Sequence, residues 1–438
     1  SGGFLMDSIF HKQSLLFPPE DVSQKHLQKY DLLLSNINFS PLKNQHTTGR
    51  IPTPKDAILA SLIYKNISSI PTLSDLIREL NEHPNLAYKL GFLPSASMPS
   101  VERLSSFLRD TPNDILQSIR EDLVRKLIAA GEIAGRFVST DSCPVAAHVK
   151  ENNLKTVVKE RFNKTKTTKG DPDARLGVIV TFPSESQKKI SFFWGYRNHV
   201  VTDALSELPI SEITKPANIH DSKLIIPQLM HIKETFSLPI EAVIADSAFD
   251  SALIIEFIVK ELGAKPVIAK NPRGGTQNTN LKISSKGNPI CIAGFDMISR
   301  GIFYDKSQNR KRHKFICPIT ASKKFAKKVP VCPWWHPKFL NGSGCITYLR
   351  VDVDENIRKS IDYGSETFKK LYNLRVSSER IFSRLLSLCM QTPSVTGLNA
   401  ISNHCTIAHI SVLAVALTAV KTDQRDKIRF VKTLFPNL

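Results

Sequence analysis

The spacing of apolar residues along the first third of the chain predicts helices. Apolar residues recur every three or four positions from Pro54 to Tyr64 and from Thr72 to Leu80, and the pattern returns over Ser100–Leu108 and Asn113–Ala130. We therefore predict a helical region over residues 20–135. Short helices joined by tight turns are typical both of a helix-turn-helix arrangement and of an ordinary packing domain, and the pattern does not separate the two.

The pattern changes at Arg136, after which β-branched and aromatic residues gather in short runs. The predicted strands are Phe137–Asp141, Arg175–Phe182, Ile190–Val201, Ala242–Asp246 and Lys265–Ala269, with helical spacing near residues 222–234 and 251–262. Three strands, a helix, and then alternating strand and helix is the element order of an RNase H-like α/β core. A further helical pattern surrounds Glu379, and the apolar stretch Ile401–Ala419 predicts a closing helix against the sheet.

A segment rich in Gly, Pro, Asn and Lys interrupts this core. It carries a basic run, Lys306 to Lys328, without one acidic residue, and we interpret it as an inserted β-rich subdomain. The predicted domains are a tag remnant with an N-terminal tail (1–19), a helical DNA-binding or dimerisation region (20–135), an RNase H-like core in two parts (136–270 and 363–438) and a basic, Cys-containing insertion (271–362). The predicted fold class is α/β.

The charge balance points to a polyanionic partner. The 438 residues include 59 Lys plus Arg against 40 Asp plus Glu, which gives a formal charge of +19. Neutralising phosphates releases counterions, so nucleic acid is the first candidate, and a basic protein with no specific partner is the alternative. No uninterrupted apolar stretch of about 18 residues is present, so we expect a soluble, cytoplasmic, nucleoid-associated protein without a membrane partner. The seven cysteines are expected to be mostly reduced.

Three acids lie in sequence contexts that would bring them to one metal site. Asp141 and Asp246 each end an apolar run that predicts a strand, and Glu379 lies within a helical pattern. In a parallel sheet, strand ends bring side chains from separate segments together. Carboxylates are the ligands that Mg²⁺ prefers, and two such ions can activate an attacking oxygen and stabilise a leaving one. These acids therefore indicate a phosphoryl-transfer site that uses Mg²⁺, for which Mn²⁺ is a substitute.

The helix predicted around Glu379 has one chemical face. Tyr372, Arg375 and Glu379 fall within a narrow arc at about 100° per residue. Judged alone, an acid beside Arg375 and Arg380 is equally an ordinary surface ion pair.

The spacing Tyr372-x2-Arg375-x3-Glu379 resembles the Tyr-Arg-Glu-Lys signature of DDE transposases from bacterial insertion sequences. The other segments that resemble this family are Ser139-Thr-Asp141-Ser, Gly195-Tyr-Arg-Asn-His199, Pro216-Ala-Asn-Ile-His220-Asp221-Ser, Ala245-Asp246-Ser-Ala-Phe-Asp250 and Cys291-x2-Gly294-x2-Met297. The resemblance spans residues from about 50 to 420. It departs at Leu386, where the family has a lysine seven residues after the glutamate.

The resemblance implies that Asp141, Asp246 and Glu379 hold two Mg²⁺ ions. Water would then cut at a transposon end, and the freed 3′-hydroxyl would attack target DNA without a covalent enzyme intermediate. Tyr372 and Arg375 would grip phosphates of the double-stranded DNA. The contact of the family lysine is either lost or supplied by Arg380 or Arg384. A homodimer is expected, since two transposon ends must be held together.

The insertion adds two weaker hypotheses. Its four cysteines suggest a structural zinc, but none of them forms a close pair, so unligated thiols are the alternative; the residues are Cys291, Cys317, Cys332 and Cys345. The basic run supplies candidate DNA contacts, Lys311 and Arg312 among them, and the stretch Lys150–Lys169 is a further candidate. Solvated loops would have the same composition.

Three functions fit these observations. The first is a DDE transposase with metal-dependent cleavage and strand transfer. The second is a domesticated DNA-binding protein that has lost catalysis, for which Leu386 is the argument. The third is an RNase H-like nuclease without strand transfer, which would cut without needing particular terminal sequences.

Overall fold

The computed structural model describes most of the chain. The described residues are 25–42, 53–93, 98–184, 187–271, 282, 284, 286, 288–307, 310–335, 339, 342, 344–350 and 361–434. They separate into two compact units. The first unit comprises residues 1–246 and 369–438, and the second comprises residues 247–368.

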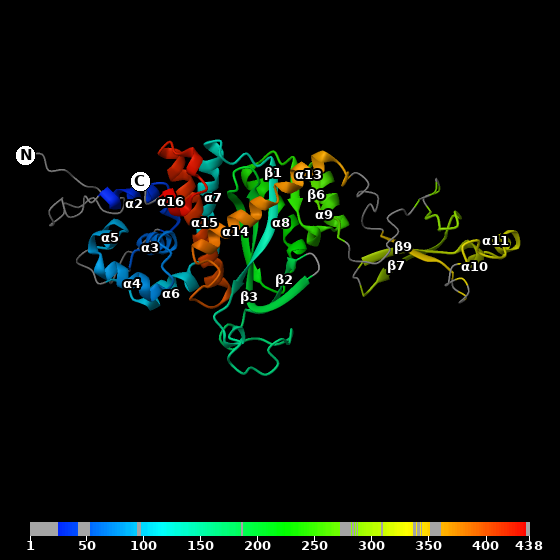
Figure 1. Ribbon diagram of the computed structural model, residues 1–438, viewed down its shortest axis with the longest axis horizontal. Coiled ribbons are helices and arrows are strands. Elements are labelled where there is room, and N and C mark those ends of the chain that lie inside the picture. Colours follow the sequence, from blue (N-terminus) through cyan, green and yellow to red (C-terminus); the bar gives the residue numbers. More distant parts are fainter. Residues whose placement is uncertain are drawn as a thin grey trace, which may run out of the picture. The chain divides into compact units, whose positions relative to one another are not determined.

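The first unit is built on a mixed β-sheet (Figure 1). Its strands are β1 (Phe137–Ala146), β2 (Arg175–Ser184), β3 (Gln187–Asp203), β4 (Pro209–Pro216) and β5 (Ala242–Ala245). The long strand β3 pairs antiparallel with β1, β2 and β4, whereas β1 pairs parallel with β5. All four residues of β5 are buried, as expected for a strand covered on both faces.

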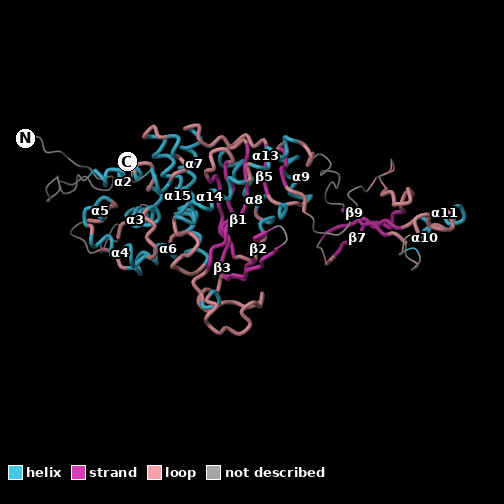
Figure 2. Tube along the Cα trace, in the orientation of Figure 1, coloured by secondary structure: helices cyan, strands magenta, loops and turns pink. Residues whose placement is uncertain are grey.

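Helices supply most of the remaining secondary structure of this unit (Figure 2). They are α2 (Lys25–Leu34), α3 (Lys55–Ile67), α4 (Leu73–Glu82), α5 (Pro84–Lys89), α6 (Val101–Asp110), α7 (Asn113–Ala129), α8 (Ile225–Phe236), α13 (Glu366–Asn373, which begins in the second unit), α14 (Val376–Ser387), α15 (Leu398–Lys421) and α16 (Val431–Leu434). The Thr72 and Ser100 side chains accept hydrogen bonds from the backbone N–H groups of Asp75 and Arg103, which caps α4 and α6. The helical N-terminal prediction is confirmed, while its DNA-binding role stays a prediction.

Helix α15 organises the core. It packs against α2, α3, α6, α7 and β4. It is long and apolar enough to cross a membrane, but its most apolar window is entirely buried inside the protein. It is therefore the closing core helix that the apolar stretch Ile401–Ala419 predicted.

The second unit contains α9 (Ala252–Glu256), a π-helical turn (Phe257–Glu261), β6 (Lys265–Ile268), α10 (Pro318–Ala321), α11 (Lys323–Lys328) and an antiparallel sheet of β7 (Ile298–Asp305), β8 (Arg310–Ile316) and β9 (Ile346–Arg350). Cys317 and Cys332 are buried beside Ile319, and Cys345 packs against this small core. The predicted β-rich character of the insertion is confirmed over the described residues.

Two details differ from the sequence prediction. Strand β4 was not predicted, because its sequence lacks the alternation of apolar and polar residues that marks a strand. Its polar residues are buried along with its apolar ones. The prediction that one continuous helix carries both Tyr372 and Glu379 is wrong, since α13 ends at Asn373 and α14 begins at Val376. Tight turns join them, in which the Arg375 N–H donates to the Tyr372 carbonyl oxygen at 2.9 Å.

Candidate active site

Two aspartates lie at the same level of the sheet, Asp141 on β1 and Asp246 directly after the parallel neighbour β5. Ser139 of β1 is in register with Ile244 of β5. Asp141 and Asp246 each lie two residues beyond that pair, so both acids extend from neighbouring strands about 4.8 Å apart. Asp141 lies within β1 rather than at its end, because β1 continues to Ala146.

The environment of Asp141 disfavours its negative charge. Its Oδ1 accepts the Ser142 N–H at 2.7 Å. Burial, together with the charges of Asp246 and Asp221, raises the pKa of Asp141 to about 7, although the Ser142 hydrogen bond and Arg375 oppose the shift. Negative charge is therefore concentrated at this point, as in sites that hold a cation.

Arg375 connects the third acid to the first. Its Nη2 lies 2.5 Å from Oε1 of Glu379, and its Nη1 lies 3.9 Å from Oδ2 of Asp141. The Glu379 side chain is 54 % exposed, so it is open to a ligand as well as to Arg375. A hydrogen bond of 2.6 Å between the hydroxyls of Ser139 and Ser378, both fully buried, ties α14 to β1 next to these acids.

Tyr372 belongs to the same cluster. Burial raises the pKa of Tyr372, Arg375 opposes the shift, and the charges of Asp246 and Asp141 add to it. The break between α13 and α14 therefore does not separate the tyrosine from Arg375. Tyr372, Arg375 and the three acids are brought together by β1, β5, the end of α13 and the start of α14.

A fourth acid, Asp221, also faces this cluster. It begins a 3-10 turn, Asp221–Lys223, and its Oδ1 lies 2.9 Å from Nδ1 of the buried His199. Burial disfavours the Asp221 carboxylate, but the hydrogen bond and charge of His199 and the charge of Arg197 lower the pKa of Asp221. The Ser142 hydroxyl accepts from Arg197 at 3.1 Å. Its contacts with His199 of β3 and Ser142 of β1 make Asp221 a supporting acid of this cluster.

The other predicted DNA contacts lie elsewhere. Arg380 and Arg384 both pair with the buried Glu207, which also pairs with Arg429. Burial lowers the pKa of Arg384 to about 10 despite that partner. Arg384, with 13 % of its side chain exposed, therefore anchors α14 internally, whereas the Arg380 side chain is 61 % exposed. Leu386, at the family lysine position, is 40 % exposed.

Lys311 and Arg312 lie on β8 of the second unit. Lys311 is exposed, and Arg312 pairs with Asp305 at 3.3 Å and stacks over Tyr348. Nothing in these contacts tests their role in DNA binding, which stays a prediction.

Potential metal ligands can also be compared by distance. Among the described residues, one group of three has ligand atoms within 4.8 Å of one another: Glu79, Glu82 and His83, largely exposed at the end of α4. The four insertion cysteines and the three acids do not form such a group. All seven cysteines are free in this structure, and their redox state stays a prediction.

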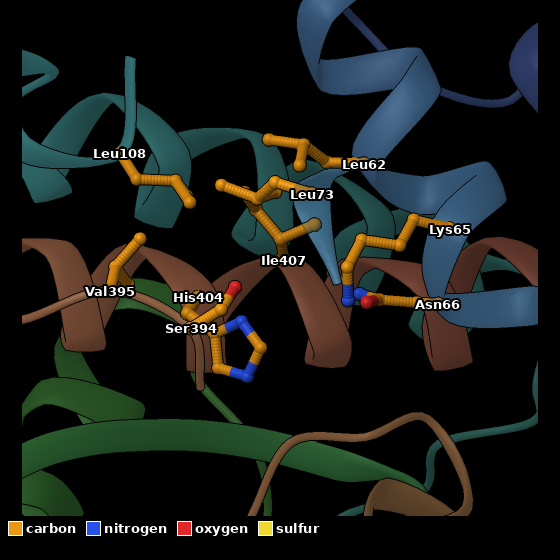
Figure 3. A pocket seen from close by; sticks show the side chains of 9 residues that line it. All are labelled: Leu62, Lys65, Asn66, Leu73, Leu108, Ser394, Val395, His404 and Ile407. Atoms are coloured by element: carbon orange, nitrogen blue, oxygen red, sulfur yellow. The ribbon is translucent and has the colours of Figure 1, made fainter. Parts of the chain in front are cut away.

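A small hollow lies among α3, α4, α6 and α15 (Figure 3). The side chains of Lys65 and His404 enter an otherwise largely apolar lining, and burial lowers the pKa of both, that of His404 to about 4. It contains none of the acids described above and is not a candidate for the same chemistry.

Comparison with known proteins identifies the family of the chain. The family model for the transposase DDE domain matches residues 164–414, which is more than half of the 438 residues. The chain belongs to this family. DDE transposases are DNA-cutting and DNA-transferring enzymes that generally use divalent metal ions. The match includes Asp246 and Glu379, and Asp141 precedes it.

Among solved structures, the chain is similar to a piggyBac transposase synaptic complex with hairpin DNA, determined by cryo-electron microscopy. The identity is 12 %, the TM-score is 0.36, and the similarity covers 94 % of this chain and 80 % of the other. A search of curated proteins by sequence found no match.

Proposed function

We propose that this DDE transposase cuts the DNA ends of a mobile element and joins them to target DNA through Asp141, Asp246 and Glu379. The observation that supports this most is the convergence of the three acids. Asp141 of β1 and Asp246, directly after the parallel strand β5, lie at the same level of the sheet. Arg375, at the start of α14, links Asp141 to Glu379. The order β4-β3-β1-β5, with β1 antiparallel to β3 and parallel to β5, fits an RNase H-like core.

The donor set suits hard divalent cations. Carboxylate oxygens from Asp141, Asp246 and Glu379 would hold Mg²⁺, or Mn²⁺ in its place, with Asp221 close enough to add negative charge. The raised pKa of Asp141 supports this assignment, because crowded carboxylates in a buried position are stabilised by a cation. When bound, the metal ions supply the charge that stabilises the attacking and leaving oxygens.

The protein's own residues position the DNA. Arg375 has a planar guanidinium that matches a phosphate, and the Tyr372 hydroxyl lies in the same cluster. In this structure Arg375 is paired with Glu379. When DNA and metal bind, Arg375 would instead contact a phosphate and Glu379 would bind a metal ion. The substrate is double-stranded DNA, as the basic composition favours, and joining two ends requires a homodimer.

The test is cleavage of DNA that carries the native flanks of the coding sequence. We expect cuts at both flanks in Mg²⁺ or Mn²⁺ and none in a chelator. Asp246→Asn should abolish cutting while leaving DNA binding intact, whereas Asp426→Asn, an exposed acid near the C-terminal end of the chain, should cut like the wild type. Metal-dependent cutting without flank preference would favour a nuclease. Flank binding by a wild type that does not cut would favour a domesticated DNA-binding protein.

A further inference from the structure

Residues 147–174, between β1 and β2, form a long loop on the first unit. We call it the β1–β2 loop. Figure 1 shows it extending from the end of the sheet formed by β2 and β3. Neither the acids nor their supporting residues lie on it, so the proposed chemistry leaves its purpose open.

Polar contacts fix the base of this loop to β3. The Asn152 amide donates to the carbonyl oxygens of Ala147 and Trp194, at 2.7 and 2.8 Å, and its Oδ1 accepts the Trp194 N–H at 2.8 Å. Farther along, the buried Asp171 accepts the Tyr196 hydroxyl at 2.6 Å. Both ends of the loop are therefore attached to one rigid strand.

Arg161 fixes the middle of the loop. Its guanidinium donates to the carbonyl oxygens of Glu151, Asn153 and Thr156, and its own carbonyl oxygen accepts the indole N–H of Trp194 at 2.8 Å. A charged donor shared by three carbonyl oxygens gives stronger bonds than neutral pairs do. The loop is held in one shape by its own hydrogen bonds.

This rigid loop nevertheless exposes apolar side chains. Leu154 is 80 % exposed and Val157 is 96 % exposed, while Phe162, at 53 %, packs against Phe192 of β3 with tilted rings whose centroids lie 5.2 Å apart. Apolar side chains presented on a fixed scaffold indicate a contact surface more strongly than the same side chains on a loose chain.

The charge around these apolar side chains identifies the partner. The same loop carries five exposed lysines against two exposed acids, Glu160 and Asp173; the lysines are Lys150, Lys155, Lys159, Lys164 and Lys169. Duplex DNA offers phosphates at the edges of an apolar-walled minor groove, and DNA-bending proteins insert Leu, Ile, Met or Phe there. A protein partner would have to supply several acids to match these lysines.

We infer that the β1–β2 loop binds duplex DNA, with its lysines on the phosphates and with Leu154 and Val157 entering the minor groove and bending the helix. The inference rests on the proposed function only in taking DNA as the substrate. It adds a second contact surface, separate from the acids, that grips the duplex beside the cleaved strand.

The test is fluorescence anisotropy of a labelled duplex with the full chain over a range of salt concentrations. Leu154→Ser with Val157→Ser should weaken binding about 10- to 100-fold and leave the salt slope unchanged. Lys155→Gln, Lys159→Gln and Lys164→Gln together should make the slope shallower by about 0.9 per lysine. Met230→Ser, at a 45 % exposed position on α8, is the matched apolar control and should bind like the wild type.

Two further measurements separate the alternatives. Energy transfer between dyes at the duplex ends should report bending by the wild type and a straighter duplex with the serine variant. Arg161→Lys keeps the charge but loses the three-carbonyl scaffold, so it should also reduce bending.

Serine variants that bind and bend DNA normally while cutting it would overturn this inference alone. Loss of a dimer in light scattering, with DNA binding intact, would overturn it in favour of a second copy of the chain. A wild type that binds no DNA would overturn both this inference and the proposed function.

Discussion

Asp141→Asn should stabilise the metal-free protein at neutral to alkaline pH while abolishing its activity. The raised pKa of Asp141 means that its ionised form is disfavoured in the fold. The unfolded chain ionises at the ordinary pKa of 3.8, so the fold loses stability as the pH rises from about 4 to 7 and stays at the lower value above that. Asparagine keeps an oxygen for the Ser142 N–H and carries no charge, so this cost disappears.

The size of the gain follows from the shift. Moving the pKa from 3.8 to about 7 corresponds to about 4 kcal/mol at 1.36 kcal/mol for each pKa unit. The Asp141 side chain is 25 % exposed, so solvent screening reduces that figure, and we expect about 2–4 kcal/mol near pH 8. Near pH 4 Asp141 is protonated in the fold and only about half ionised in the unfolded chain, so the gain should fall below about 1 kcal/mol.

Urea unfolding of the two proteins in a chelator, at about pH 4 and pH 8, measures this difference. Added Mg²⁺ should then stabilise the wild type and leave Asp141→Asn nearly unchanged, because a ligand that binds only the folded state adds to its stability. Asp426→Asn is the control and should change neither value. A variant that is less stable than the wild type at pH 8 without metal would refute the electrostatic reasoning.

Four other outcomes follow from the same geometry. Glu207→Gln should loosen α14, measured as faster hydrogen exchange of its amides, whereas Glu132→Gln, which loses another largely buried carboxylate–arginine pair, should not affect α14. Ser378→Ala should destabilise the fold by about 1–3 kcal/mol in urea unfolding, because the buried hydroxyl of its partner on β1 loses its hydrogen bond. Mn²⁺ binding, followed by electron paramagnetic resonance, should strengthen as the pH rises to about 7 and then level off, since protonated Asp141 competes with the metal. Arg375→Lys should reduce cleavage more than tenfold with the fold intact by circular dichroism, because lysine cannot pair with two acids in one plane.

The long periodic elements were predictable from the sequence because their apolar faces are buried in one core. The apolar stretch Ile401–Ala419 became α15, and the capped patterns before α4 and α6 became those helices. Strand β4 was missed for a physical reason. Its Ser211, Glu212 and Thr214 are buried and polar, so the alternation that normally marks a strand is absent. Glu212 is satisfied by Asn198, Gln117 and Thr406, partners from three other elements that a local pattern does not show.

The candidate site was predictable to the extent that it is local. Asp141 and Asp246 stand out because each follows a run that forms a strand, and the Tyr372, Arg375 and Glu379 spacing survives the break between α13 and α14. The supporting residues are different. Glu207 meets Arg384 across more than 170 positions, and Ser139 meets Ser378 across 239. Only the folded chain brings such pairs together, so their roles follow from the structure.

Strand joining tests the central claim most directly. A precut duplex with a free 3′-hydroxyl at the native flank would be incubated with supercoiled plasmid in Mg²⁺, using wild type, Glu379→Gln and the exposed-acid control Asp426→Asn. The account predicts plasmids covalently joined to the labelled end with wild type and Asp426→Asn, and none with Glu379→Gln. Joining by Glu379→Gln at the wild-type rate, or hydrolysis of DNA by the wild type with no joined product, would contradict it.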